Sequence, residues 1–319
     1  MEDQLNDFFP LVSIVITSYN RAKWIGQCIE SAMAQDYANL EIVICDDGST
    51  DNSDQIIKKY LHDPRIKYTR NAVNIGMIKN FNKVFFELAK GKYVTQIGSD
   101  DYLIHPQFIS KAVNLIRKYE NISMIFAKAT MINEETKETL PSFDSRYDIE
   151  FKTGHDLFMN FPKYPYYTAG GVLYSLDHLT ANDINFTGRI TADIEMNLQL
   201  MLCGNVGFIN EVVYVIRQHG ANASGSVKTA KDLEYSYIEL IKVIYNKAQP
   251  VISDKKALNK WYKKLITKNL KMCIYMIVRQ RDRKQSFLFH KLMVKKYKKE
   301  YIRFILTNPK YLIKMLLNR

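Results

Sequence analysis

The chain has 319 residues, 47% of them hydrophobic, which is enough for one large domain or two modest ones with an ordinary core. Its first residues lack the basic start and apolar stretch of a signal peptide, and it has no apolar run of about 18 residues or more, so we expect neither secretion nor a spanning helix. The 4 cysteines are far apart and fit no zinc spacing, which is typical of buried thiols in a reducing compartment. We therefore expect a cytoplasmic protein.

The net charge of +12 is unevenly distributed. Residues 226–319 carry 24 Lys and Arg against 6 Asp and Glu, a balance of +18, whereas residues 1–225 carry 21 against 27, a balance of −6. A basic region of this strength indicates a polyanionic partner, either nucleic acid or an anionic lipid surface.

Strands and helices alternate in the first hundred residues. Short β-branched or apolar runs predict strands, and apolar residues spaced by three and four predict helices that pack one face on a sheet. The expected strands are 11–16, 40–45, 66–68 and 92–97, and the expected helices are 25–33, one around 56–61, and 77–89. This order predicts an α/β fold with a mostly parallel sheet flanked by helices.

After residue 102 the alternation weakens. Two further strands are expected at 123–130 and 207–216, and the segment between 139 and 185 is irregular and rich in Tyr, Phe and Pro. Aromatic loops of this kind suit a ligand cleft, and they equally suit the core of a small subdomain.

Polar side chains gather where the predicted strands end, at residues 17–20, at Asp46 and Asp47, and at Asp100 and Asp101. In parallel sheets ligands bind outside the carboxyl ends of the strands, so the three clusters predict one site. Adjacent carboxylates at a strand end suit a divalent cation that also holds a diphosphate, although an isolated Asp-Asp pair is more often a turn or a helix cap.

Several ordered segments together resemble the family 2 glycosyltransferases. They are 12–20 (VSIVITSYN), 41–51 (EIVICDDGSTD), 74–76 (NIG), 98–101 (GSDD), 192–193 (AD) and 217–219 (RQH), with Ser224 beyond. The resemblance implies a GT-A (Rossmann-like) fold over residues 10–225, with a nucleotide-sugar-binding half at 10–101 and an acceptor half at 102–225.

The resemblance also implies the residues that bind the donor. Thr17 and Tyr19 would hold its base and ribose, with a simple strand end as the alternative for Thr17. Asp47 would accept a hydrogen bond from the N–H of a uracil ring, or else cap a helix. Gly76 belongs to the donor-binding motif, and Lys79 would reach phosphate or remain a solvated helix charge.

The family's metal-binding pattern falls on Asp100 and Asp101. Asp100 would contact ribose or support the metal, and Asp101 would be the direct ligand of Mn²⁺ or Mg²⁺, which bridges the two phosphates and stabilises the departing diphosphate. The first carboxylate of the family pattern is missing, since Gly98 or Ser99 stands there. His219 would contact metal or phosphate, or be a hydrogen-bonded surface residue.

Asp193 is the expected catalytic base. Direct displacement at an anomeric carbon needs a base that takes the proton of the acceptor hydroxyl, and the product then has inverted configuration. The family usually has Glu-Asp here, and this chain has Ala192, so Glu195 is a rival. Asp193 would otherwise cap a helix.

Residues 226–319 are predicted to form a basic amphipathic helical region. Leu258, Trp261, Tyr262, Leu265 and Ile266 repeat at helical spacing with Lys on the other face, and 311–317 continue after Pro309. Such segments suit an interfacial helix on an anionic membrane, or a helical cap whose lysines are merely exposed.

We therefore expect a metal-dependent, inverting hexosyltransferase. It would move a sugar from a UDP-linked donor to a glycan or lipid-linked acceptor in surface polysaccharide synthesis, peripherally on the inner face of the cell membrane. A nucleic-acid-binding protein is the alternative, although no nucleic-acid motif accompanies the charge. A nicotinamide-dependent dehydrogenase is disfavoured, because the first turn lacks three spaced glycines.

Overall fold

The chain folds into two compact units that interleave along the sequence. The computed structural model describes residues 9–140, 149–161, 170–220 and 229–311. The first unit contains residues 1–187 and 200–222, and the second contains 188–199 and 223–319. Ser224 and most of the predicted segment 311–317 lie outside the described residues. The domain division at residue 225 stays a prediction, because packing groups 188–199 with the C-terminal helices.

The first unit is built on one sheet, in the order β3-β2-β1-β4-β9-β6-β10-β5. Its first four strands are parallel and confirm the four expected ones: β1 (Val12–Ser18), β2 (Leu40–Asp46), β3 (Ile66–Arg70) and β4 (Tyr93–Gly98). Every residue of β2 is buried, as its unbroken apolar run predicts for a strand covered on both faces.

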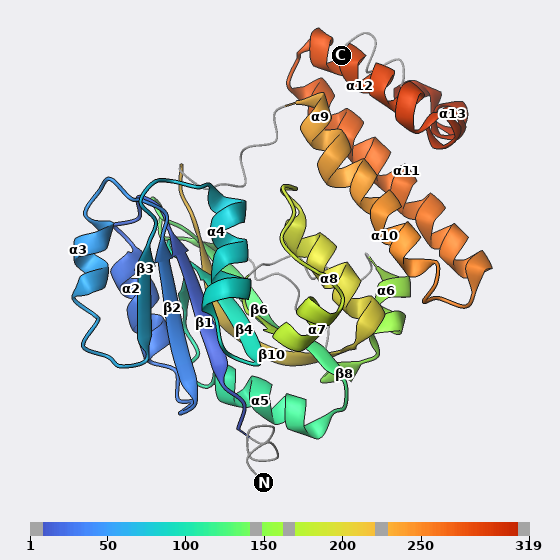
Figure 1. The fold of residues 1–319 in the computed structure, drawn as a ribbon. Helices are drawn as coiled ribbons and strands as arrows, with labels where there is room; N and C mark the ends of the chain where they lie inside the picture. The colour runs from blue at the N-terminus through green and yellow to red at the C-terminus, as the bar shows by residue number, and fades with distance from the viewer. Residues whose placement is uncertain (1–8, 141–148, 162–169, 221–228, 312–319) are drawn as a thin grey trace. The chain divides into compact units, whose positions relative to one another are not determined.

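Helices cover both faces of this parallel half. They are α2 (Ile25–Met33), α3 (Ser53–Lys58) and α4 (Met77–Lys83), the last continuing as the π-helix η1 (Val84–Leu88). Ile14 and Ile16 of β1 share a core with Ile25 and Cys28 of α2, while η1 contacts β1 and β2. Figure 1 shows α4 in front of the strands and α2 behind them.

The second half of the sheet is mixed. Strand β9 runs antiparallel to both β4 and β6, whereas β6 and β10 are parallel to each other. The elements are β5 (Tyr102–Leu103), α5 (Phe108–Lys118), β6 (Ile122–Asn133), β7 (Thr139–Leu140), β8 (Phe151–Lys152), α6 (Gly154–Asn160), β9 (Val172–Ser175), α7 (Leu176–Ala181) and β10 (Asn205–Gln218). Short regular elements therefore occupy parts of the segment that we expected to be irregular.

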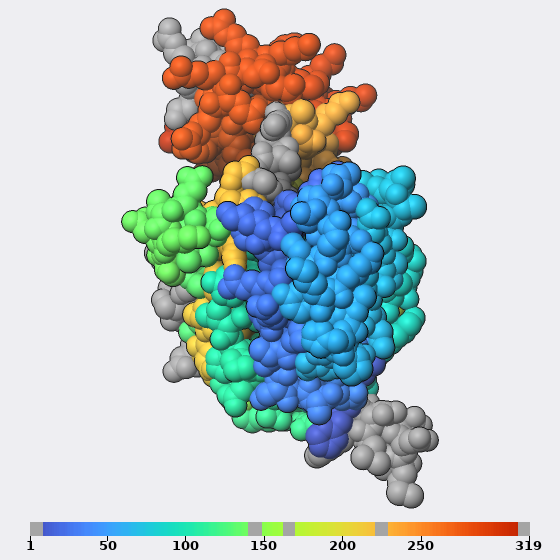
Figure 2. Space-filling model, turned by 90° about the vertical axis from the view of Figure 1, so that its left-hand side faces the viewer, coloured from blue at the N-terminus to red at the C-terminus, as the bar shows by residue number. Residues whose placement is uncertain are grey.

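The second unit is helical, as predicted. It contains residues 192–199 of α8 (Ala192–Cys203), then α9 (Ala230–Leu233), the π-helix η3 (Glu234–Glu239), α10 (Leu240–Ala248), α11 (Lys255–Arg279), α12 (Arg283–Lys296) and α13 (Lys298–Thr307). Figure 2 shows residues 255–311 gathered into one mass. The apolar stripe of α11, including Leu258, Trp261 and Leu265, is buried. Among the described residues, no helix has the length and apolarity needed to cross a bilayer.

Candidate active site

The carboxyl ends of β1, β2 and β4 meet at one edge of the sheet. Thr17 pairs in register with Cys45 of β2 and with Gly98 of β4, and Ser18 pairs with Asp46. The three strands therefore end at the same height in the sheet, and the residues that follow them begin side by side. This register brings the predicted polar clusters to one edge, as the alternation of strands and helices implies.

A tight turn after β4 holds Asp100 and Asp101. The amide of Asp101 donates to the carbonyl of Gly98 at 2.8 Å. A side chain at position 98 would start 2.9 Å from Oδ2 of Asp101 and 3.1 Å from Oδ1 of Asp100. Gly98, one of the two positions at which the family pattern has its first carboxylate, thus leaves room for both acidic side chains to fold back over the turn.

Partners from two distant segments contact these carboxylates. Oδ2 of Asp100 accepts from Nε of Arg21 at 3.1 Å and lies 3.1 Å from Nε2 of His219. Asp101 accepts from the hydroxyl of Tyr214 at 2.9 Å and from the amide of Arg217 at 2.8 Å. The β1–α2 loop and the end of β10 therefore converge on the turn after β4.

The carboxyl group of Asp101 ionises less readily than that of an ordinary aspartate. Burial, and then the neighbouring charge of Asp100, raise the pKa of Asp101 to about 7. Hydrogen bonds from the Arg217 amide and the Tyr214 hydroxyl oppose this rise without cancelling it. A cation bound at this turn would relieve the crowding of two negative charges.

Asp47 organises the loop before α4. It is 3% exposed, and its Oδ1 accepts from Asn71 Nδ2 at 2.8 Å and from the amide of Ile75 at 2.9 Å. Its Oδ2 accepts from the amide of Gly76 at 3.0 Å. Gly76 has a φ of +90°, a conformation that favours glycine. Asp47 thus holds the motif 74–76, and its contact with a base stays a prediction.

The other predicted donor residues differ in exposure. Tyr19 is 43% exposed and Lys79 is exposed on α4, so both side chains are accessible to a ligand. Asp46, by contrast, is fully buried and pairs with Nε of Arg70 at 3.0 Å, so its contacts are those of a structural residue.

Sequence reasoning missed the support around His219. Its ring stacks on Trp24, with centroids 4.3 Å apart, and Nε1 of Trp24 donates to Glu134 at 3.3 Å. Arg21 directly follows the motif that ends at Asn20, and Trp24 lies three residues further on; this proximity is the signal for them in the sequence. No pattern pointed to Glu134 or Tyr214.

Asp193 lies in the second unit, in the first turn of α8. Burial raises the pKa of Asp193 to about 6. The rival carboxylate, Glu195, is 3% exposed, and both of its oxygens accept from Nη1 of Arg189, at 3.0 and 2.8 Å. An acid already engaged in this way is poorly placed to take a proton. The assignment of Asp193 as the base stays a prediction.

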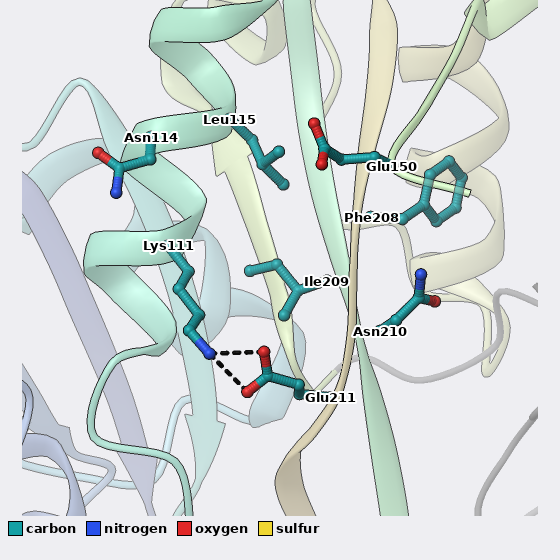
Figure 3. A pocket seen from close by; sticks show the side chains of 8 residues that line it. All are labelled: Lys111, Asn114, Leu115, Glu150, Phe208, Ile209, Asn210 and Glu211. Atoms are coloured by element: carbon teal, nitrogen blue, oxygen red, sulfur yellow. Dashed lines mark hydrogen bonds and ion pairs between the residues drawn. The ribbon is translucent and has the colours of Figure 1, made fainter. Parts of the chain in front are cut away.

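A separate cavity of about 470 Å³ lies in the first unit (Figure 3). Nζ of Lys111 on α5 lies 2.5 and 2.6 Å from the two carboxylate oxygens of Glu211 on β10. The residues lining the cavity are Lys111, Asn114, Leu115, Glu150, Phe208, Ile209, Asn210 and Glu211. None of the predicted site residues lines it.

Comparison with known proteins gives concordant matches. The model of the family described as "Glycosyl transferase family 2" matches residues 13–179. Chondroitin synthase from Escherichia coli is 29% identical over 228 residues, which cover 67% of this chain and 30% of that protein. Hyaluronan synthase from Pasteurella multocida is 34% identical over 136 residues, 42% of this chain and 14% of that protein. The chain thus spans less than a third of the length of these curated relatives.

Solved structures share the fold. Residues 1–349 of S. aureus TarS in complex with UDP-GlcNAc superpose with a TM-score of 0.67 at 19% identity, covering 82% of this chain and 72% of that one. The mannosyltransferase PcManGT from Pyrobaculum calidifontis, in complex with GDP-Man and Mn²⁺, gives 0.54 at 14% identity, covering 97% and 86%. These likenesses confirm the expected GT-A fold.

Asp100→Asn should lower the pKa of Asp101 in the metal-free protein. The substitution removes the neighbouring negative charge, while burial keeps the pKa of Asp101 above its ordinary value of about 3.9. Carboxyl ¹³C NMR titration measures the shift, and Asp54→Asn, at a half-buried carboxylate that pairs with Lys58, is the remote control. A pKa of Asp101 that stays at about 7 would show that Asp100 exerts no such effect.

The same substitution should change how stability depends on pH. Between about pH 4 and pH 7 folded Asp101 retains a proton that the unfolded chain has released, so its contribution to the free energy of unfolding falls as pH rises. Urea unfolding of both proteins should show a smaller fall over this range for Asp100→Asn. Identical slopes would contradict the expectation.

Proposed function

Because the chain belongs to glycosyl transferase family 2, whose model matches residues 13–179, we propose that it transfers a hexose from a UDP-linked donor, with inversion, to a glycan or lipid-linked acceptor. The enzyme is related to polysaccharide synthases, and we place its acceptor in surface polysaccharide synthesis. The observation that carries the proposal is the convergence of Asp100, Asp101 and His219 at the carboxyl edge of the sheet.

A divalent cation fits this convergence. Among the described residues no three His, Cys, Asp or Glu side chains are grouped to hold a metal by themselves. At diphosphate sites, however, Mg²⁺ and related ions use one or two carboxylates together with phosphate oxygens, so two protein ligands suffice. The mannosyltransferase of similar fold contains Mn²⁺ with its nucleotide sugar. We therefore propose Mn²⁺ or Mg²⁺ as the cofactor.

The contacts favour Asp100 together with His219 as the residues that hold the ion. Their Oδ2 and Nε2 atoms are already 3.1 Å apart, whereas the oxygens of Asp101 accept from Tyr214 and Arg217. The sequence prediction gave the direct role to Asp101. When bound, the cation would supply Lewis-acid stabilisation of the departing diphosphate.

The donor-binding residues act around this centre. Thr17 and Tyr19 would contact the nucleoside, and the accessible ammonium of Lys79 would reach phosphate. Asp47 would either meet the uracil N–H with its remaining acceptor capacity or set the position of Gly76 beside the donor. Asp193 would take the proton of the attacking acceptor hydroxyl.

A donor screen tests this function directly. The protein with Mn²⁺ should release UDP from one or more UDP-sugars when acceptor oligosaccharide is present, and EDTA should abolish this release. The measurement is a coupled assay for nucleoside diphosphate, with GDP-sugars as the comparison. Full turnover in EDTA would contradict the proposed metal dependence. Release of nucleoside diphosphate from GDP-sugars alone would contradict the proposed UDP-linked donor.

Asp193→Asn should reduce kcat/KM by about 10²- to 10⁴-fold, because the amide cannot accept the proton. In the wild-type enzyme kcat/KM should rise with pH and level off above about pH 6, since Asp193 must be ionised to act. Steady-state kinetics from pH 4.5 to about 8 measure both. The exposed Asp177→Asn is the matched control. Unimpaired turnover by Asp193→Asn would assign the base elsewhere.

We also propose that the basic helical region binds an anionic membrane at the inner face of the cell membrane. The apolar stripe of α11 is buried among the helices, so the proposal does not rest on that helix. The exposed faces of α12 and α13 remain. There Phe287 and Val294 lie seven residues apart, and Ile302 and Leu306 lie four apart, so each pair shares a helix face.

Basic side chains flank these exposed apolar residues. Lys284, Lys291 and Lys295 lie within four residues of Phe287 or Val294 on α12, and all are exposed. On α13 the exposed Lys299 and Arg303 flank Ile302. Alternating apolar and basic groups suit the headgroup boundary of an anionic bilayer, where each basic residue contributes about 1 kcal/mol.

Phe287→Gln with Leu306→Gln should weaken binding to vesicles that contain anionic lipid, while leaving donor turnover in solution unchanged. Co-sedimentation with anionic and with zwitterionic vesicles measures this, and the exposed Leu61→Gln in the first unit is the control. Equal vesicle binding by the double variant would show that these faces of α12 and α13 do not contact the membrane. Tight binding to an oligonucleotide but not to vesicles would favour the nucleic-acid alternative.

A further inference from the structure

The β1–α2 loop and the first turn of α2 contact both the turn after β4 and the end of β10. Arg21 reaches Asp100, Trp24 stacks on His219, and the guanidinium of Arg217 donates to the side chain of Gln27 in α2. These parts of the chain are far apart in sequence but lie in the same unit. His219 is therefore placed by neighbours from outside its own strand.

Two contacts fix the imidazole of His219. The indole of Trp24 lies parallel to it, with a centroid distance of 4.3 Å and an interplanar angle of 21°, and this contact sets the plane of the ring. The bond of 3.1 Å between Nε2 and Oδ2 of Asp100 sets its direction within that plane. The side chain is only 6% exposed, although exposed Gly220 follows it directly.

Glu134 in turn fixes Trp24. Oε1 of Glu134 accepts from Nε1 of Trp24 at 3.3 Å and lies 3.2 Å from Nζ of Lys23, and Oε2 lies 3.2 Å from Nζ of Lys137. Burial opposes the charge of this carboxylate, but hydrogen bonds from Lys23 and Trp24 outweigh it and lower the pKa of Glu134 to about 2. Glu134 is thus a charged acceptor throughout the physiological range.

Burial of apolar surface alone does not explain the contacts that Trp24 makes with His219 and Glu134. The indole of Trp24 is only half-buried, so it contributes less apolar burial than the core aromatics do. Two of its contacts are instead directional: one face meets an imidazole, and the single N–H meets a carboxylate. Cζ of Arg21 and Nζ of Lys23 also lie 5.9 and 5.0 Å from the ring centroid. Partners that orient a metal-binding histidine in this way commonly change metal affinity by about 10- to 100-fold when they are removed.

We propose that Trp24, oriented by Glu134, is a positioning residue that holds Nε2 of His219 against Asp100 for binding of the metal–diphosphate group. The proposal rests on the function proposed above, because it presumes that the turn after β4 binds a nucleoside diphosphate with its cation. Trp24 and Glu134 contact neither the cation nor the donor in this role. In this role they act through His219.

A double-mutant cycle tests the coupling. Trp24→Leu, His219→Ala and the combined variant are compared with the wild type by calorimetric titration of UDP in the presence of Mn²⁺. We expect Trp24→Leu to weaken UDP binding about 10-fold and to have no further effect once His219 is gone. Trp24→Phe keeps a ring that can stack on His219 but loses the indole N–H, and Glu134→Ala removes the acceptor of that N–H. Both variants should therefore lose less UDP affinity than Trp24→Leu.

Tyr119→Leu is the matched control. Tyr119 also stacks on a ring, that of Phe151 at 4.5 Å, and its hydroxyl also donates to a glutamate, Glu150 at 2.8 Å. This variant therefore removes a comparable set of contacts from the same unit, and it should lower the melting temperature without changing UDP affinity. Losses of equal size in Tyr119→Leu and Trp24→Leu would show that only general destabilisation is at work.

A readout without ligand separates this inference from the proposed function. In ¹⁵N-histidine NMR at one fixed pH, Trp24→Leu should shift the Nε2 resonance of His219, whereas Tyr119→Leu should not. An unshifted resonance, or additive losses of UDP affinity for Trp24→Leu and His219→Ala, would overturn the inference. If the wild type binds no UDP while the resonance shifts, the proposed function fails and the placement of His219 by Trp24 stands.

Discussion

Two like charges lie next to each other at the end of one buried strand, and the surrounding chain has to stabilise them. Asp100 and Asp101 fold back over Gly98, where water is scarce, and burial together with their mutual repulsion raises the pKa of Asp101 to about 7. Such a pair persists only if the surrounding chain supplies donors and positive charge. Arg21 and His219 do so for Asp100, while Tyr214 and the amide of Arg217 do so for Asp101.

The parallel half of the sheet could be predicted because its information is local. Strands buried on both faces are read directly from runs such as residues 40–45, and strand–helix alternation fixes which ends of the strands meet. The edge that carries Asp47, Asp100 and Asp101 follows from that alternation alone. The family resemblance assigned roles to these residues. Those roles stay proposals, because contacts within the chain do not show how a donor binds.

The remaining parts depend on pairings that no periodicity records. Trp24 and Glu134 meet across 110 residues, and β9 inserts antiparallel between β4 and β6. Nothing in residues 188–199 indicates that they pack with helices formed much later in the chain. In the basic region the apolar spacing predicted helices correctly, but an apolar stripe has the same appearance whether it faces lipid or, like that of α11, other helices.

The position of β10 near the end of the first unit has a consequence for synthesis of the chain. The bonds from Asp100 to His219 and from Asp101 to Arg217 span 119 and 116 residues. A nascent chain that has exposed only its four parallel strands therefore carries the two carboxylates before the partners from the end of β10 exist, and only Arg21 is already present. Since domains fold as they emerge, the acidic turn must stay hydrated until β10 is made and pairs with β6. The order of translation thus delays closure of this edge of the sheet until β10 has been made.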